Sequence, residues 1–206
     1  MSRTEEISSD VKAVSAAAEE VRNRAEEALE FARNEIDTAY EHGWDGVGQS
    51  INIAGEALEK IVEELDSTSG TFENVAKSLD AISEQMSHNE VAEQLALTMT
   101  EIDAGHETMQ GTSELVEEAL TGADQAEHQS LGTRLHKLRE EVEKLAGQLQ
   151  QSRSDIESEH EQAEKMGQQE ADAEAKKRED EQGQEKDDED RRDEDGDRRS
   201  GRAAQS

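Results

Sequence analysis

The sequence predicts an all-α protein in which long antiparallel helical hairpins form a coiled coil or four-helix bundle, followed by a disordered C-terminal tail. Three observations predict this fold class. None of the 206 residues is proline, the residue that most often interrupts helices. Apolar residues recur at alternating spacings of three and four over four long stretches, as in heptad seams. Glycine-containing or capping segments separate these stretches, so each stretch predicts one helix.

The first helix is predicted over residues 4–41 and the second begins near residue 47. The first seam is rich in alanine and valine and consists of Ile7, Val11, Val14, Ala18, Val21, Ala25, Ala28 and Ala32. The segment Gly43-Trp44-Asp45-Gly46 then predicts a tight hairpin turn. Gly43 suits the left-handed conformation that follows a helix, Trp44 can pack back on the helix as the hairpin anchor, and Asp45 can cap the next helix.

The second helix is predicted over residues 47–86 and the third over 89–120. The segment Ser67-Thr68-Ser69-Gly70-Thr71 has low helix propensity, but the heptad phase is unbroken on both sides, which favours one continuous helix. Ser87 with Glu90 three residues later forms a capping-box pattern that predicts the start of the third helix. The segment Thr121-Gly122-Ala123-Asp124 predicts the third turn.

The fourth helix is predicted over residues 130–166, and it carries the strongest seam of the chain. The candidate contact residues of this seam are Leu135, Leu138, Val142, Leu145 and Leu149. Burying one such side chain contributes roughly 1.5 to 3 kcal/mol. Heptads do not fix whether the buried partner is internal or external, so these residues are either core contacts or contacts to a helical partner.

Residues 1–166 are thus expected to form one helical bundle, and residues 167–206 a charged tail. The apolar pattern ends near Gly167, and the tail has 9 basic and 15 acidic residues, a net charge of 9 − 15 = −6. Such a composition is typical of disordered segments. Most of the formal charge of −31 therefore lies on the helical part.

Composition and charge exclude several classes of function. A charge of −31 repels nucleic acid and anionic lipid, so we expect no nucleic-acid partner. No apolar stretch approaches the ~20 residues that cross a bilayer, so we expect no membrane insertion. The N-terminus lacks the basic and apolar regions of a cleavable signal peptide. The expected location is the cytoplasm, with export without such a signal left open.

No pattern in the sequence predicts catalysis, a cofactor or a metal site. The six histidines show no spacing typical of metal ligands, and the abundant carboxylates are expected on solvated helix faces. The glycines near Trp44 follow a helix and lack the Lys-Ser/Thr of a phosphate loop. A basic cluster of Arg134, His136, Lys137 and Arg139 is expected either to pair with neighbouring acidic helices or to contact a partner.

Two resemblances accompany these patterns. The Trp44-Asp45-Gly46 turn between two helices of about forty residues resembles the Trp-x-Gly hairpin of the small type VII secretion substrates of Gram-positive bacteria. Those proteins carry a tyrosine after the second helix, whereas the one tyrosine here, Tyr40, precedes the turn. In addition, Gly46-Val47 leading into Glu56-Ala57-Leu58, and Ala119-Leu120 leading into the leucine seam, resemble an uncharacterised family of helical actinobacterial proteins, which implies the architecture and no activity.

The sequence therefore favours a non-enzymatic helical interaction or structural protein that acts through its heptad seams. The partner would be another helical protein or a second copy of this chain, as in a homodimer. One alternative is a secreted or secretion-associated protein of the Trp-x-Gly type. Another is an assembly scaffold, suggested by acidic helices followed by Arg198, Arg199 and Arg202.

Overall fold

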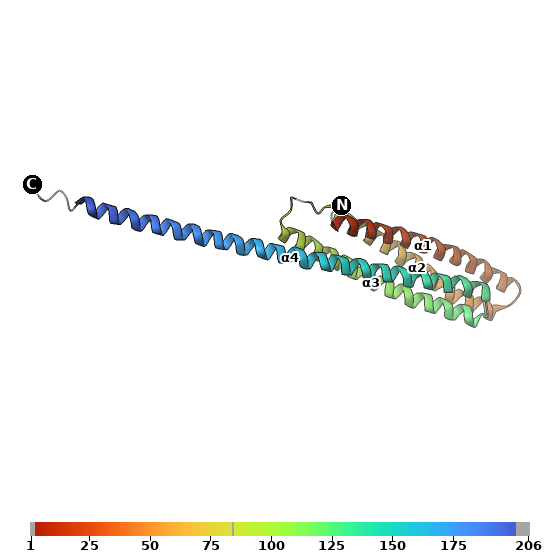
Figure 1. Cartoon of the computed structure of the whole chain (residues 1–206). Helices are drawn as coiled ribbons and strands as arrows, with labels where there is room; N and C mark the ends of the chain where they lie inside the picture. The colour runs from red at the N-terminus through yellow and green to blue at the C-terminus, as the bar shows by residue number, and fades with distance from the viewer. Residues whose placement is uncertain (1–2, 84, 201–206) are drawn as a thin grey trace, which may run out of the picture.

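The computed structural model describes residues 3–83 and 85–200, and side chains as far as residue 178. This part of the chain consists of four helices without strands, and they run in antiparallel order around one core (Figure 1). Each helix packs against the next, and α1 also packs against α4, which closes the bundle. The bounds of the helices are α1, Arg3–Glu41; α2, Asp45–Asp80; α3, His88–Gln125; and α4, Gln129–Ser200.

The predicted seams form the core of this bundle. Leu58, Ile61 and Phe72 of α2 are fully buried against the other helices. The α1 seam contributes mainly alanine and valine to the same core, and the buried positions repeat with the helical period along every helix. The all-α fold class and the helical bundle predicted from the sequence are therefore confirmed.

Two local predictions are also confirmed. The α2 helix runs without interruption through residues 67–71, and its hydroxyl groups donate to carbonyl oxygens one turn earlier, as Thr68 does to Glu64 at 2.7 Å. Ser87 and Glu90 form the expected capping box at the start of α3. The hydrogen bond from the Ser87 backbone, and then that from its side chain, lower the pKa of the Glu90 carboxyl.

The α2 helix ends at Asp80, before the predicted end at Met86. The chain has to reverse here because α3 packs antiparallel to α2, so the heptad phase cannot continue as helix. Asp80 is held by α1, where it accepts hydrogen bonds from Ser8 at 2.5 Å and from Lys12 at 2.7 Å. Ile82 and Met86 are half-buried in the linker that follows.

The turn predicted at residues 121–124 is wrong, because α3 continues through Gln125. Gly122 is an interior helix residue that lets α3 approach α2 closely. A Cβ atom at Gly122 would lie 2.7 Å from the backbone oxygen of Ser50 and 2.9 Å from the backbone nitrogen of Ala54. The glycine thus serves helix packing, and the α3–α4 turn lies at residues 126–128.

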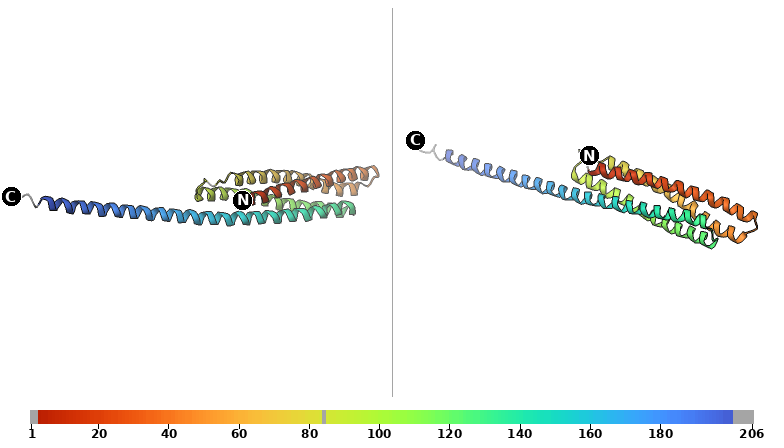
Figure 2. Two further views of the ribbon diagram at one scale, coloured as in Figure 1. Left: turned by 45° about the horizontal axis from the view of Figure 1, so that its top comes forward. Right: turned by 45° about the vertical axis from the view of Figure 1, so that its right-hand side comes forward.

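The α4 helix extends far beyond the bundle (Figure 2). Gly167 is its last buried residue among those with described side chains, and residues 168–178 are all exposed, as expected for a tail outside the core. The charged tail predicted outside the bundle is therefore confirmed, and the backbone of α4 continues into it as helix to Ser200. A proline-free run rich in Glu, Gln, Lys, Arg and Ala favours this continuation. The side chains of Arg198 and Arg199, and the whole of Arg202, lie outside the described part of the chain.

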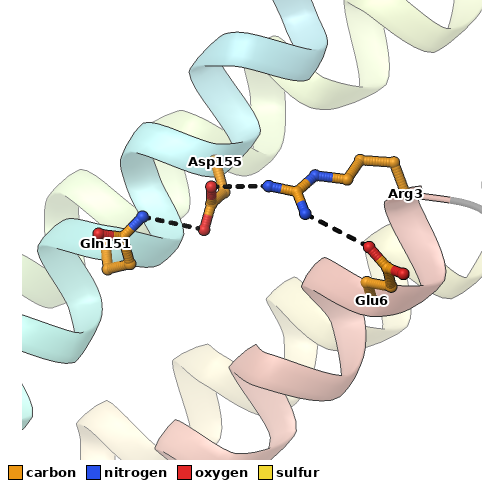
Figure 3. A network of polar contacts seen from close by, with 4 residues as sticks. All are labelled: Arg3, Glu6, Gln151 and Asp155. Atoms are coloured by element: carbon orange, nitrogen blue, oxygen red, sulfur yellow. Dashed lines mark hydrogen bonds and ion pairs between the residues drawn. The ribbon is translucent and has the colours of Figure 1, made fainter.

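The two ends of the bundle differ. The turn end carries the α1–α2 turn (residues 42–44) and the α3–α4 turn (126–128), whereas the open end carries the start of α1, the linker 81–87 and the exit of α4 (Figure 1). At the open end Arg3 of α1 donates to Asp155 of α4 at 2.9 Å and to Glu6 at 3.3 Å (Figure 3). These contacts fasten the first turn of α1 to α4.

Candidate interaction site at the turn end

The two turns at this end have the same hydrogen-bonded backbone. In the α1–α2 turn, Gly43 N–H donates to Tyr40 and Trp44 N–H donates to Ala39, at 3.0 and 2.8 Å. In the α3–α4 turn, Glu127 N–H donates to Asp124 and His128 N–H to Ala123, at 3.0 and 2.9 Å. Gly43 and Glu127 both have positive φ, 73° and 53°. Each turn is therefore a Schellman-type helix end.

The two hairpins correspond along their whole length. Each residue of the first hairpin is equivalent to the residue twelve heptads later in the second hairpin. Ala39 and Ala123 accept the equivalent turn hydrogen bonds, and their separation in sequence is a whole number of heptads. Buried positions of α2 recur on α4 with this offset, and positions of α1 recur on α3. Such pairs include Ile51 and Leu135, Leu58 and Val142, Ile61 and Leu145, Leu65 and Leu149, and Phe72 and Ile156. The bundle thus consists of two hairpins in matching register.

The side chains of the two turns differ. Tyr40 and Trp44 of the first turn are 46% and 57% exposed. They are the only tyrosine and the only tryptophan of the chain. The Trp44 ring stacks on His42, with 5.0 Å between ring centroids. His42 Nδ1 donates to the carbonyl oxygen of Thr38 at 2.7 Å, which orients the imidazole. We call Tyr40, His42 and Trp44 the aromatic tip.

Tyr40 is held against the start of α2 by a glycine. A Cβ atom at Gly48 would lie 3.0 Å from Cε1 and Cζ of the Tyr40 ring. At the equivalent Gly132 no atom lies within 4 Å of the Cβ position. The close approach at Gly48 is therefore due to the Tyr40 ring, and not to the backbone geometry that the two hairpins share.

In the α3–α4 turn, the side chain at the start of α4 makes contacts within the bundle. His128 Nδ1 accepts a hydrogen bond from the backbone N–H of Leu131 at 3.2 Å and caps α4. The proton of the neutral ring is then on Nε2, which contacts Glu35 of α1 at 3.0 Å. Phe31 packs edge-on against His128, and the guanidinium of Arg134 lies 4.6 Å from the Phe31 ring centroid. This turn is tied to the bundle by contacts that the aromatic tip lacks.

Two predictions for the first turn are corrected here. Trp44 occupies the N-cap position of α2 without a side-chain cap, and Asp45 is the first helical residue, so Asp45 is not the cap. The Trp44 ring contacts His42 but does not enter the core. The left-handed conformation predicted for Gly43 is confirmed, while Gly46 lies in the first turn of α2 with open space around its Cβ position.

Exposed acidic side chains flank the aromatic tip in the sequence and occupy the neighbouring turn. Asp37 and Glu41 on α1 and Asp45 on α2 are all exposed, as are Asp124 and Glu127 on the neighbouring turn. An exposed apolar surface bordered by charges of one sign attracts a partner of opposite charge and repels others. We call Asp37, Glu41 and Asp45 the acidic rim.

The structure places the predicted seam of α4 in the core. All five residues are at most 2% exposed, namely Leu135, Leu138, Val142, Leu145 and Leu149. Of their two predicted roles, intramolecular packing is the one that these burial values support. Within the basic cluster, Arg139 pairs with Glu117 at 3.4 Å, which agrees with charge pairing, whereas Lys137 and His136 are exposed.

Among the described residues, no group of three or more histidine, aspartate and glutamate side chains could hold a metal ion. Within the same part of the chain, no helix is both long and apolar enough to cross a membrane. Sequence reasoning named Trp44 but missed Tyr40, His42 and Gly48 as parts of one site. The observation that could have found them is that the only Tyr and the only Trp flank one turn.

No protein-family model, curated protein or solved structure matches this chain. The resemblances to type VII secretion substrates and to the helical actinobacterial family therefore stay predictions.

Proposed function

We propose that this protein is a non-enzymatic helical-bundle interaction protein that docks a protein partner through its aromatic tip. The observation that carries the proposal is the comparison of the two turns. The α3–α4 turn forms the same backbone with Asp124, Glu127 and His128, so the exposed rings of the first turn are not needed to form such a turn. Exposed tryptophan and tyrosine side chains are typical of the few residues that dominate protein interfaces.

The tip has two further features of a binding site. Its rings are pre-oriented, Tyr40 by Gly48 and Trp44 by His42, so that little conformational entropy would be lost on docking. Its acidic rim favours a partner with an apolar pocket and basic flanks.

Of the two roles expected for the heptad seam of α4, core packing and contact with a partner, the burial of its residues supports core packing. Because the five named α4 residues are buried within the chain, an interaction through them would require the bundle to open. Opening would expose several buried Leu, Val and Ile side chains, each at a cost of roughly 1.5 to 3 kcal/mol. We therefore assign the seams to the fold and the aromatic tip to the interaction.

A photo-crosslinking amino acid tests the proposal. Placed at Gln49, an exposed residue that follows Gly48 and lies outside the aromatic tip, it should crosslink a specific protein in extracts of the native cells, and the additional substitution Trp44→Ala should abolish that product. The same probe beside Leu97, which is 63% exposed on α3, is the matched control for nonspecific apolar contact. Crosslinks of equal yield from both positions, or crosslinks unchanged by Trp44→Ala, would refute the tip as the docking site.

A second candidate function is that of a substrate or accessory protein of a type VII-like secretion system. It is favoured by the position of Trp44-Asp45-Gly46, on an exposed turn between two long antiparallel helices. In a host with such a system, the protein should accumulate in the medium, and Trp44→Ala with Gly46→Ala should retain it in cells. Retention of the wild-type protein in cells whose export is active would eliminate this candidate.

A further inference from the structure

The open end of the bundle contains a pocket of about 730 Å³ that lies between the linker 81–87, the start of α3 and the exit of α4. Two of its lining residues, Met86 and Met166, carry thioethers, and a third, His88, carries an imidazole. Met166 is 42% exposed, so this side chain is accessible from solvent. Thioethers select the soft ion Cu(I), and imidazole also suits copper. The pocket therefore contains three side chains of the kinds that bind copper.

Met166 and His88 come from two segments of the chain that meet closely at the open end (Figure 1). A Cβ atom at Gly167 would overlap the side-chain oxygen of Asn89, so the backbone of α4 passes directly beside the start of α3. His88 Nδ1 lies 2.9 Å from Oε1 of Glu170. Glu170 follows Met166 by four residues, so the two share a face of α4. This face therefore presents both Met166 and the partner of His88 to the start of α3.

The capping box at the start of α3 places Met86 at the same pocket. Ser87 is the N-cap, and Met86 precedes it, in the position from which an apolar side chain packs against the fourth helical residue, here Val91. Val91 and His88 lie three residues apart on one face of α3, and both line the pocket. Met86 thus reaches the pocket from the linker, His88 from α3 and Met166 from α4.

The contact with Glu170 prepares His88 as a ligand. A carboxylate only accepts hydrogen bonds, so Nδ1 of His88 carries the proton that it donates to Glu170. In the neutral ring, Nε2 then has a lone pair. Histidines that bind metals usually donate their other ring N–H to such an acceptor, which fixes the tautomer and makes the ligand more basic. Glu170 therefore gives His88 the support that a metal-binding imidazole requires.

The charge of the pocket suits a cation, and its ligand atoms suit a soft one. Glu5 and Glu159 line the pocket, and among the described residues neither lysine nor arginine does. Hard cations such as Ca²⁺ and Mg²⁺ need several oxygen ligands. Over residues 3–83 and 85–200, no group of three or more histidine, aspartate and glutamate side chains could hold such an ion. The two thioethers therefore decide which ion the pocket favours.

We infer that the open-end pocket binds one Cu(I) ion through the thioether sulfurs of Met86 and Met166 and through Nε2 of His88. The ion accepts three lone pairs, and the neutral ring keeps its proton on Nδ1, so binding needs neither a redox step nor the loss of a proton. The site lies at the opposite end of the bundle from the aromatic tip, and the inference does not rest on the proposed function.

Titration of Cu(I) without oxygen, in competition with the chromogenic chelator bicinchoninate, measures the affinity. The wild-type protein should take one equivalent of Cu(I) from the chelator. Met86→Leu, Met166→Leu and His88→Gln should each weaken binding by about tenfold or more, because each removes one ligand atom. Leucine has a similar volume to methionine, so both leucine variants should fold, which circular dichroism checks. Met99→Leu, at a half-buried position of α3 outside the pocket, is the matched control and should leave the affinity unchanged.

Methionine methyl resonances distinguish ligands from residues that only pack. In protein labelled with ¹³C at the methionine methyl groups, the leucine variants assign the signals of Met86 and Met166. Addition of Ag(I), a soft ion with the same charge as Cu(I), should shift these two signals. The signals of Met99 and of Met109, which is buried in the core, should stay in place. A purely structural role of Met86 and Met166 would produce no such selective shift.

Two further variants test the support from Glu170 and the independence from the tip. Glu170→Gln should weaken Cu(I) binding by about tenfold, because the neutral amide accepts the His88 proton less strongly. Glu164→Gln is the matched control, since Glu164 contacts His160 of its own helix and should not affect the site. Trp44→Ala should leave the Cu(I) affinity unchanged.

A protein that takes no Cu(I) from bicinchoninate would overturn the inference. An affinity unchanged by both leucine variants would do the same, because other groups would then hold the ion. Displacement of Cu(I) by an equal concentration of Zn(II) or Ca(II) would also contradict the selectivity that the thioethers predict. None of these outcomes affects the crosslinking at the aromatic tip, so failure of this inference and failure of the proposed function are distinguishable.

Discussion

The α1–α2 hairpin and the α3–α4 hairpin share one heptad register and a turn with the same hydrogen bonds, yet they expose different side chains. The first turn carries an aromatic pair in solvent, while the second uses His128 and Glu35 to fasten itself to the bundle. The comparison teaches which features the helical hairpin requires. Features present in both hairpins serve folding, and exposed aromatic side chains that only one hairpin carries, without a contact to the core, are candidates for function.

The largest expected effect tests whether equivalent positions of the two hairpins contribute alike to the core. Ile61 and Leu145 occupy equivalent positions of the two hairpins, and both are at most 1% exposed. Truncation to alanine should destabilise the protein by about 2 to 5 kcal/mol at either position, because each leaves a cavity in the core. Urea unfolding of the two variants measures this cost. A cost below about 1 kcal/mol at one position would show that the two hairpins are not packed alike.

Gly122 marks a place where the equivalence is broken. The corresponding residue of α1, twelve heptads earlier, is Thr38, which is exposed. Gly122→Ala should cost about 1 to 3 kcal/mol, because the new Cβ meets the backbone of Ser50 and Ala54, which cannot yield as a side chain can. Chemical denaturation checks the value.

The control for this substitution is Gly70→Ala on α2, where no atom lies within 4 Å of the Cβ position. It should stabilise the protein by up to about 1 kcal/mol through helix propensity alone. If Gly122→Ala were equally stabilising, α3 would not approach α2 as closely as described.

Substitutions at the two turn residues with positive φ should change the stability by similar amounts in opposite directions. Gly43→Ala should destabilise by about 1 to 2 kcal/mol, since φ is 73° there. Glu127→Gly should stabilise by up to about 1 kcal/mol, because glycine adopts the φ of 53° without a Cβ penalty. Thermal unfolding of both variants provides the measurement. The same sign for both changes would contradict the shared turn geometry.

The smallest effect concerns pH at the open end. The hydrogen bonds from Lys12 and then Ser8 lower the pKa of Asp80. A folded-state pKa below the unfolded value stabilises the protein above the unfolded pKa, and this stabilisation is lost as the pH falls through the folded pKa. Asp80→Asn should therefore lower the melting temperature at neutral pH and lose this difference in acid. For an exposed pair, about 0.2 to 1 kcal/mol is involved.

The equivalent residue in the second hairpin is the control. Glu164 lies twelve heptads after Asp80 and contacts His160 of its own helix at 3.9 Å, whereas the α3 equivalents of Ser8 and Lys12 are Ala92 and Ala96, which have no side-chain donors. Glu164→Gln should leave the acid dependence of the melting temperature unchanged. An equal loss of acid dependence in both variants would assign the effect to general charge and not to the α1–α2 contact.

Local sequence patterns determined much of this protein. The heptads of α1 to α4, the capping box at Ser87 and the left-handed Gly43 all follow from residue type and spacing, because helix periodicity and end geometry depend on neighbours within one or two turns. The continuity of α2 through residues 67–71 followed for the same reason, since its heptad phase could be read on both sides.

Only the tertiary structure decided what lies between segments distant in sequence. Gly122 resembles a turn residue until Ser50 and Ala54 are seen against it, and α2 stops at Asp80 because the antiparallel partner requires a reversal. The α4 seam became core, and Tyr40 and Trp44 became surface, through packing that no local spacing specifies. Periodicity marks an apolar face, but which surface covers that face depends on contacts between whole helices.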